Sequence, residues 1–360
     1  MPSADHAPAR FADLPGWESD DHLAAFETFR RSAIQALKKP SRDGSDGRTF
    51  ARMRPLFEAA ANTTSGSQTA SRNFFEQSFK PLRIVNSDGA QGLVTGFYEP
   101  VVDGSRQRTE IFPSPIFRQP DDLVEIDDTN RPEQMDAYFR FAQKTGKRLD
   151  CYPDRGEIER GYLKGRGLEL VHVANRVEAF FIHVQGAARI RLDDGSQMAI
   201  TYAAKTGHPF TGPGRILLDR GEVPQAQMSM QAIRQWLHDN PDRADELLWQ
   251  NRSFIFFKET PVENPDLGPV AAAKVQLTAG RSMAVDREKY VFGSAFYVAA
   301  PKVNFGDNKP FQRLMVAQDT GSAILGAARG DLFTGSGFEA GEIAGRIKAE
   351  ADFWLLVPRD

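Results

Sequence analysis

Three aspartates in the last quarter of the chain each lie at or just beyond a short apolar run. Asp286 ends Ser282-Met283-Ala284-Val285-Asp286, Asp319 follows Val316-Ala317-Gln318, and Asp331 precedes Leu332-Phe333-Thr334-Gly335. Short apolar runs predict strands, and polar residues at strand ends lie where backbone amides are free to contact a ligand. The pattern therefore predicts a polar, carboxylate-containing site built on β-structure.

The residues alone leave more than one chemistry open for these carboxylates. Asp319-Thr320-Gly321-Ser322 matches the Asp-Thr-Gly-Ser motif of pepsin-like aspartic proteases. Such proteases need two aspartates that share a proton, and the chain has only one such motif. Glycoside cleavage instead needs an acid beside the departing oxygen and negative or dipolar groups near the sugar ring. Aspartates next to glycines also form ordinary turns.

Other reaction types lack their residues. The lone cysteine, Cys151, excludes an internal disulfide and a cysteine-based zinc site. Among six scattered histidines, only His172 and His183, expected on consecutive strands, have metal-like spacing, and no third ligand is evident, so no metal or other cofactor is expected. Gly207–Gly214 is neither a dinucleotide fingerprint nor a P-loop, and Gly335-Ser336-Gly337 is only a fragment of the serine hydrolase motif.

Length and composition predict a water-soluble protein with two domains. The chain has 360 residues, of which 41% are hydrophobic and 26% charged. Its 45 basic and 48 acidic residues give a net charge of −3 in a mixed distribution, so nucleic acid is not an expected partner. No apolar run reaches 18 residues, and the N-terminus lacks the order of a secretory signal, which taken literally indicates a cytosolic protein.

The hydrophobic pattern predicts helices at the start of the chain and mainly strands after residue 93. A first helix is expected from a cap at Ser19 to Lys39-Pro40, with Trp17 stapling its start. The aromatic cluster Phe74–Phe79 has helical spacing and is expected in the core. Two further helices are expected at 229–238 and 241–249, and a last one at about 339–348.

Strands with few helices between them favour an α+β fold, mainly β, with antiparallel or barrel-like sheet. The clearest hairpin joins Ile190 and Leu192 to Met198 and Ile200 across Asp193-Asp194-Gly195-Ser196. The other expected strands are 93–99, 180–186, 254–257, 274–277, 296–299, 314–317 and 353–357.

Six separate blocks, in order along the chain, resemble the membrane-bound lytic murein transglycosylase A family. They are Phe74-Phe75-Glu76, Thr95-Gly96-Phe97-Tyr98-Glu99-Pro100, His183-Val184-Gln185-Gly186, Leu277 to Arg287, Gln318-Asp319-Thr320-Gly321-Ser322-Ala323-Ile324, and Asp331-x-Phe333-x-Gly335-x-Gly337. The C-terminal blocks resemble the "three aspartate" domain, named for residues placed like Asp286, Asp319 and Asp331.

The resemblance implies both a fold and an activity. Residues 1–104 and 251–360 would form a double-psi β-barrel domain with N-terminal helices, and 105–250 an inserted β-rich domain, with a groove between them. The groove would bind a peptidoglycan glycan strand. The enzyme would cut the MurNAc–GlcNAc β-1,4 bond without water and leave a 1,6-anhydromuramyl end.

The resemblance also suggests roles for individual residues. Asp331 would be the acid/base and Asp319 its electrostatic and orienting neighbour, although Asp319 can also be read as a turn residue. Asp286 can be read as a structural strand-end residue or as part of the substrate site. The other substrate-binding candidates are Thr95, Gly96, Tyr98, Glu99, Gln185 and Gly330, and of these Tyr98 is also compatible with a place in the core.

Two departures from the family pattern affect the surroundings of the site. Gly321-Ser322 stands where a Gly-Gly pair is usual, and Lys274-Val275-Gln276-Leu277 stands for Gly-Val-Pro-Leu. Neither removes the proposed acid. Family members are exported, so the resemblance implies a protein of the bacterial periplasm, associated with the outer membrane by an anchor absent from this chain. A monomer is expected. A non-catalytic peptidoglycan-binding module remains an alternative.

Overall fold

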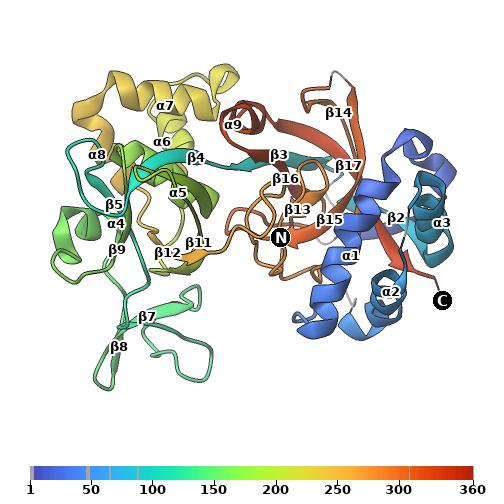
Figure 1. The fold of residues 1–360 in the computed structure, drawn as a ribbon, viewed down its shortest axis with the longest axis horizontal. Coiled ribbons are helices and arrows are strands. Elements are labelled where there is room, and N and C mark those ends of the chain that lie inside the picture. Colours follow the sequence, from blue (N-terminus) through green and yellow to red (C-terminus); the bar gives the residue numbers. More distant parts are fainter. Residues whose placement is uncertain (1–3, 46–48, 65, 87–88, 308, 360) are drawn as a thin grey trace. The chain divides into compact units, whose positions relative to one another are not determined.

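The computed structural model describes residues 4–45, 49–64, 66–86, 89–307 and 309–359. The chain separates into two compact units, Met1–Tyr98 with Asn264–Asp360, and Glu99–Glu263. The domain limits predicted from the sequence were 104/105 and 250/251. Both units contain helices and more strand than α-helix, which confirms the predicted α+β, mainly β class (Figure 1).

A closed six-stranded barrel forms the centre of the first unit. Its sheet has the order β1-β2-β17-β14-β15-β13-β16-β3, and an additional pairing of β17 with β3 closes strands β3, β16, β13, β15, β14 and β17 on themselves. This barrel agrees with the predicted barrel class. The strands are β1 (Ala4–Pro8), β2 (Phe79–Asn86), β3 (Gly92–Glu99), β13 (Ser282–Ala284), β14 (Ala295–Asn304), β15 (Pro310–Asp319), β16 (Arg329–Ser336) and β17 (Lys348–Pro358).

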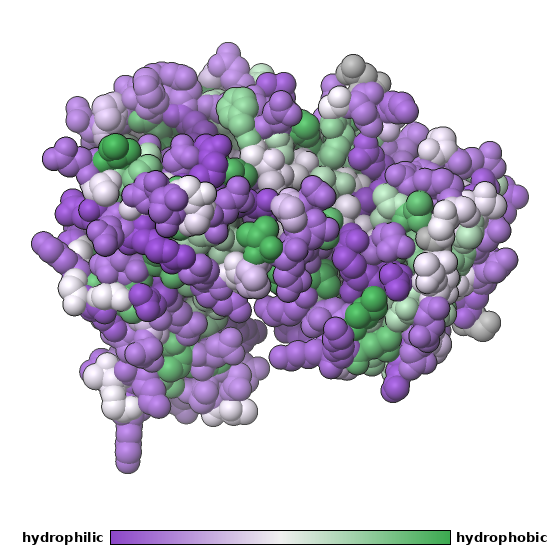
Figure 2. Space-filling view, in the orientation of Figure 1, coloured by the Kyte–Doolittle hydropathy of each residue, from purple (hydrophilic) through white to green (hydrophobic). Residues whose placement is uncertain are grey.

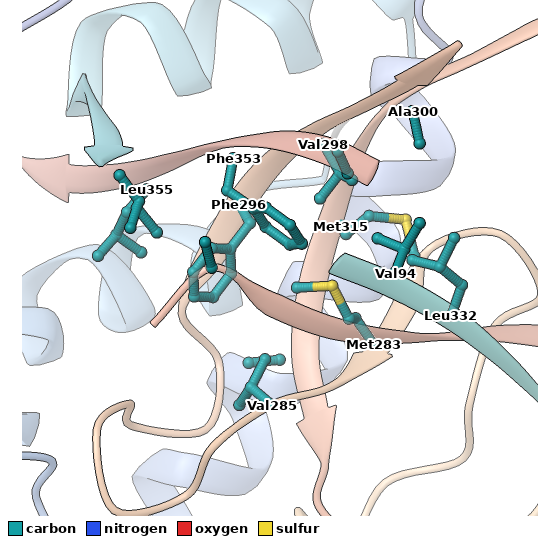
Figure 3. Close-up of a cluster of buried hydrophobic side chains, with 14 of the residues drawn as sticks. Val94, Met283, Val285, Phe296, Val298, Ala300, Met315, Leu332, Phe353 and Leu355 are labelled. Carbon is teal, nitrogen blue, oxygen red and sulfur yellow. The ribbon is translucent and has the colours of Figure 1, made fainter. Parts of the chain in front are cut away.

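The inner face of the barrel strands is buried, and part of their outer face packs against helices. Alternate side chains point inward and fill the barrel, among them Val94, Met283 and Leu332, each 0% exposed (Figure 3). Leu314 and Val316 point outward and pack beneath helices. Alternation along each strand therefore places Thr95 and Asp331, the neighbours of Val94 and Leu332, on the outer side of the barrel.

Three N-terminal helices cover the outward face that Leu314 and Val316 provide. They are α1 (His22–Lys38), α2 (Phe50–Asn62) and α3 (Gln68–Ser78). The cap of α1 is Asp21, whose side chain accepts the Ala24 amide, and not Ser19 as predicted, because Ser19 ends a preceding 3-10 turn, Trp17–Ser19. Trp17 and Phe75 are buried in this helical layer, which confirms the predicted core role of the Phe74–Phe79 cluster.

The second unit combines two small sheets with helices. A six-stranded sheet has the order β12-β11-β10-β4-β9-β5, and a three-stranded sheet the order β6-β7-β8. The predicted hairpin is confirmed, with Ile190 opposite Met198. The strands are β4 (Val101–Ser105), β5 (Ser114–Phe117), β6 (Leu123–Glu125), β7 (Phe141–Thr145), β8 (Arg148–Asp150), β9 (Glu169–Val173), β10 (Ala187–Leu192), β11 (Gln197–Lys205) and β12 (Ile255–Thr260).

The second unit contains both of the helices that the sequence predicted for it, at 229–238 and 241–249. Its α-helices are α4 (Arg155–Glu157), α5 (Arg176–Gln185), α6 (Pro213–Asp219), α7 (Met230–Asp239) and α8 (Pro241–Trp249). The predicted strand at 180–186 is wrong, because these residues form the second half of α5. Asn175 caps that helix by accepting the Glu178 amide, and Gly186 ends it with φ +75°. Its apolar run is therefore a buried helix face, which short periodicity does not distinguish from a strand.

Two further predictions near the C-terminus need correction. Residues 274–277 form no strand, only an isolated bridge between Val270 and Gln276, and Lys274 has a positive φ of 61° that breaks an extended course. The last helix, α9 (Phe338–Ala344), is shorter than predicted because β17 already begins at Lys348.

The drawn face of the molecule is mainly hydrophilic, with hydrophobic residues in small groups (Figure 2).

Candidate active site

Asp331 lies on β16 beside Thr95 of the neighbouring strand β3. The Thr95 hydroxyl donates a hydrogen bond to Oδ1 of Asp331 over 2.5 Å. The same hydroxyl accepts a hydrogen bond from the guanidinium of Arg329 at 2.8 Å. Arg329, Thr95 and Asp331 therefore form a short relay on the outer side of the barrel.

The surroundings of Asp331 favour its protonated form. Burial among protein atoms raises the pKa of Asp331 above its ordinary value, while the charge of Arg329 and the hydrogen bond from Thr95 lower the pKa in part. Asp331 as a whole residue is nevertheless only partly buried. A carboxyl group of this kind can hold a proton and release it to a ligand.

Asp319 lies at the same level of the barrel, two strands away from Asp331. Ala284 of β13 pairs with Asp331 on one side and with Asp319 on the other. Two steps between adjacent strands separate the backbones of the two aspartates by about 10 Å. Ala284, which is 4% exposed, is the residue that lies between them in the sheet.

A shift of register brings Asp319 to this position. Met283 pairs with Ala317, and a regular parallel pairing would place Gln318 opposite Ala284. The register shifts by one residue at this point, as in a β-bulge, so that Asp319 takes the place. Gln318 instead faces α1, where its amide donates to the Thr28 carbonyl and the Ser32 hydroxyl.

The pKa of Asp319 is also raised. Burial raises the pKa of Asp319 to about 6, and the nearby Asp331 adds to the rise. Hydrogen bonds from the Thr320 and Ala272 amides and the charge of Lys274 act in the opposite direction. The charge of Asp331 thus favours the protonated form of Asp319, and neighbouring carboxyl groups with different environments can take different roles.

Asp286 has a different environment from the other two aspartates. It is only 2% exposed, and its two carboxylate oxygens accept the amides of Glu288 at 3.0 Å and Gly326 at 2.8 Å. These contacts fix the turn after β13 and hold the 326 loop against it. Asp286 therefore acts on the site by holding these two backbone segments in place.

The predicted glycines and Tyr98 lie where the chain packs closely. A Cβ atom on Gly96 would lie 2.8 Å from the Cα of Ala344 in α9, and one on Gly341 would lie 2.8 Å from the Tyr98 ring. A Cβ atom on Gly330 would likewise lie too close to the Met283 side chain in the barrel interior. Tyr98 is 8% exposed, so its ring mainly packs against α9.

Two predicted residues belong to the second unit. Glu99 is 1% exposed, and its carboxylate accepts a 3.0 Å hydrogen bond from Arg189 in an ion pair. Gln185 is the last residue of α5 and is partly exposed. The structure thus brings Asp331, Asp319 and Thr95 together in the first unit and assigns Glu99 and Gln185 to the other.

Arg329 is the residue that the sequence analysis missed. It lies two residues before Asp331 on one strand, and this i, i+2 spacing places both side chains on the same face. This spacing is visible in the sequence, but it indicates no functional role for Arg329 until the structure places Thr95 beside it. In the described part of the chain, no cluster of three or more His, Cys, Asp or Glu residues is arranged to hold a metal.

The expectation that His172 and His183 lie on consecutive strands is wrong. His172 is on β9, whereas His183 is on helix α5, where its Nδ1 lies 3.2 Å from the Arg155 guanidinium. Burial together with the Arg155 charge holds the pKa of His183 well below its usual value. A neutral, buried histidine next to an arginine fits a structural role.

Comparison with known proteins identifies the family. A model described as the MltA specific insert domain matches residues 93–258, and one described as the 3D domain matches residues 281–357. The crystal structure of a membrane-bound lytic murein transglycosylase from Agrobacterium tumefaciens has 46% identity and a TM-score of 0.93, covering 99% of this chain and 98% of that one. This chain belongs to the membrane-bound lytic murein transglycosylase A family, which confirms the resemblance inferred from the sequence.

MltA of Escherichia coli is also similar to this chain, in sequence and in structure. Membrane-bound lytic murein transglycosylase A of strain K12 is 34% identical over 270 residues, which are 73% of this chain and 64% of that protein's length. A crystal structure of E. coli MltA with bound chitohexaose has 26% identity and a TM-score of 0.66, covering 100% of this chain and 93% of that one. Of the helices described here, none is both long and apolar enough to cross a membrane.

Proposed function

We propose that this protein is a lytic transglycosylase that cleaves the MurNAc–GlcNAc β-1,4 bond of peptidoglycan without water and uses Asp331 as its single acid/base. Family membership supports the substrate class. The observation that carries the assignment of Asp331 is its carboxyl group, which has a raised pKa and accepts a hydrogen bond from Thr95 on the outer side of the barrel.

The proposed reaction uses the same carboxyl group twice. Asp331 first gives its proton to the glycosidic oxygen, and the bond from that oxygen to C1 of the muramic acid breaks. The resulting carboxylate then takes the proton of the C6 hydroxyl of the same sugar, and O6 bonds to C1. Because this nucleophile is already part of the sugar, an effective molarity of about 10⁵ M or more can replace an activated water.

Asp319 serves this reaction electrostatically. With a pKa of about 6 it is mainly ionised near neutral pH. Positive charge develops on the sugar ring as the bond to the leaving oxygen breaks, and a carboxylate two strands from the acid stabilises that charge. The Ala272 amide, 3.2 Å from Oδ1 of Asp319, holds the carboxylate in place.

Digestion of purified murein, followed by mass spectrometry of the soluble products, tests the proposal. The expected muropeptides are lighter by one water than those a hydrolase releases. Asp331→Asn should lower turnover by about 10²- to 10⁴-fold, the range of general acid–base catalysis, with the fold intact. Asp352→Asn is a matched control, since Asp352 is another strand aspartate of the same unit, ion-paired with Arg83.

Other results would support other functions. Saturable sedimentation with peptidoglycan and no soluble product would indicate a binding module. Casein cleavage that a statine-type inhibitor blocks, and that Asp319→Asn abolishes, would indicate an aspartic protease. Full activity in Asp331→Asn would place the proton carrier elsewhere.

The proposed activity also determines the expected surroundings of the protein. Peptidoglycan glycan strands would be its partner, and a monomer in the bacterial periplasm, associated with the outer membrane, would have access to them. Fractionation of cells that produce the natural protein, followed by immunodetection, tests the location. Recovery in the cytosolic fraction alone would contradict it.

A further inference from the structure

Strands β14 and β17 separate near one end of the barrel and leave a pocket. They pair from Ala295 opposite Leu356 to Ala299 opposite Asp352. Beyond that point β17 pairs with β3, from Ala351 opposite Gly92 to Lys348 opposite Thr95. The end of β14, the C-terminal end of α9 and the start of β17 enclose a pocket of ≈540 Å³.

The charged side chains around this pocket are mainly basic. Lys302, Arg346 and Lys348 line it together with one acid, Glu350. Lys302 pairs with Glu350 at 3.2 Å, and Arg346 pairs with Glu342 at 2.8 Å, but both basic side chains are about three-quarters exposed, with values of 75% and 74%. Such exposed pairs are weak and exchange readily with another anion.

Lys348 is the cation that remains available. Throughout the described residues it makes no ion pair, and it is exposed. The protein as a whole carries a net charge of −3, so a basic pocket is not a consequence of general composition. Its charge favours an anionic ligand.

The pocket adjoins the candidate active site. Lys348 pairs directly with Thr95, whose hydroxyl is bonded to Asp331. Paired residues on adjacent strands have their side chains on the same face, with Cβ atoms about 5 Å apart. A ligand that reaches Asp331 therefore has Lys348 of the basic pocket two strands away, across β3.

The pocket walls fit a peptide as well as a charge. Val303, Ile343 and Ile347 supply apolar surface between the cations. Among the described residues, those of β14 beyond Ala299 pair only with β15, as in Ala300 with Phe311, so their other edge faces the gap. A strand edge of this kind can bind the main chain of an extended peptide.

We propose that this pocket binds the anionic peptide stem carried by the muramic acid whose C1 reacts. This inference rests on the proposed function, because the stem is attached to the sugar next to the proton donor. Lys348 and Arg346 would contact stem carboxylates, and the isoleucines would contact alanine methyl groups. The pocket would thus make the enzyme favour glycan strands that still carry their peptides.

The first test compares two substrates with and without the two cations. Glycan strands carrying stems and the same strands freed of stems by an amidase are digested by the natural protein and by Arg346→Gln/Lys348→Gln. We expect kcat/KM on stem-bearing strands to fall about three- to ten-fold in the double variant, with stem-free strands unaffected. Lys38→Gln, an exposed lysine on α1, is the control.

A second measurement needs no turnover. Isolated stem peptide is titrated into the natural protein, and backbone amide shifts are followed by NMR. Shifts at 302–306 and 346–350 are expected with the free peptide, and their loss is expected in the double variant and with a peptide whose carboxyl groups are amidated.

Each result decides the proposal. Unchanged amides at those positions, or an equal loss of kcat/KM on both substrates, would overturn it. If neither substrate is cleaved by the natural protein, the proposed reaction is wrong, and the peptide titration still decides whether the pocket binds the stem.

Discussion

Arg329 reaches Asp331 through the hydroxyl of Thr95. The two residues share one face of β16, yet in the described part of the chain they form no direct ion pair, and Thr95 accepts from Arg329 while donating to Asp331. A direct pair would lower the pKa of Asp331 strongly and keep it ionised. The intervening hydroxyl keeps the guanidinium close enough to orient the carboxyl group while burial still raises its pKa.

This relay predicts a shift in the pH profile. The charge of Arg329 lowers the pKa of Asp331, so Arg329→Gln removes that effect and should raise the pKa further. Since Asp331 must start protonated, activity is lost as pH rises through its pKa. The alkaline limb of kcat/KM against pH should therefore move to higher pH in Arg329→Gln.

The measurement is a pH series of initial rates on stem-free glycan, with Arg54→Gln, an exposed arginine of α2 that pairs with Glu58, as a control outside the relay. A limb that stays in place, or that moves to lower pH, would show that Arg329 does not act on the titrating group.

Asp319 predicts a second effect, on stability. Its pKa is raised from 3.8 to about 6 in the folded protein, so folding favours the protonated form. The stability that this group contributes is fully present below pH 3.8 and is lost as pH rises through about 6. Asp319→Asn does not titrate and avoids this loss.

Relative to the natural protein, Asp319→Asn should gain roughly 1 to 3 kcal/mol in free energy of unfolding between about pH 4 and pH 7.5, since each pKa unit corresponds to about 1.4 kcal/mol. Urea unfolding at both pH values measures the gain. The same difference between the two proteins at both pH values would mean that burial does not favour the neutral carboxyl group.

Glu99 predicts a third effect, which separates a structural from a substrate-binding role. Its ion pair with Arg189 is buried, with side chains 1% and 11% exposed. Glu99→Met leaves the arginine charge uncompensated and should cost about 3 to 5 kcal/mol of stability. Glu99→Met combined with Arg189→Met should recover most of that loss, because two apolar side chains replace the pair.

Thermal unfolding of the single and double variants gives the stabilities, and KM for glycan is measured for the double variant. An unchanged KM is expected if Glu99 acts through the pair. A KM raised several-fold in a stable double variant would instead show that Glu99 contacts substrate, as the sequence analysis predicted.

The sequence was informative where local chemistry decides structure. Hairpin residues 190–200 and helices α7 and α8 follow from turn residues, caps and prolines within a few positions, so they could be predicted. Residues 180–186 could not, because a buried apolar run fits strand and helix equally, and only Asn175 and Gly186 at its two ends decide for the helix.

The sequence by itself determined which residue types are available for chemistry: acidic residues at the ends of apolar strands, no cysteine pair and a family pattern in six blocks. Only the tertiary structure decided how these residues meet. The register shift that brings Asp319 opposite Ala284, the pairing of Lys348 with Thr95 and the relay from Arg329 to Asp331 all join residues from different strands. Barrel closure sets such contacts through hydrogen bonds between strands distant in sequence, and no local preference encodes them.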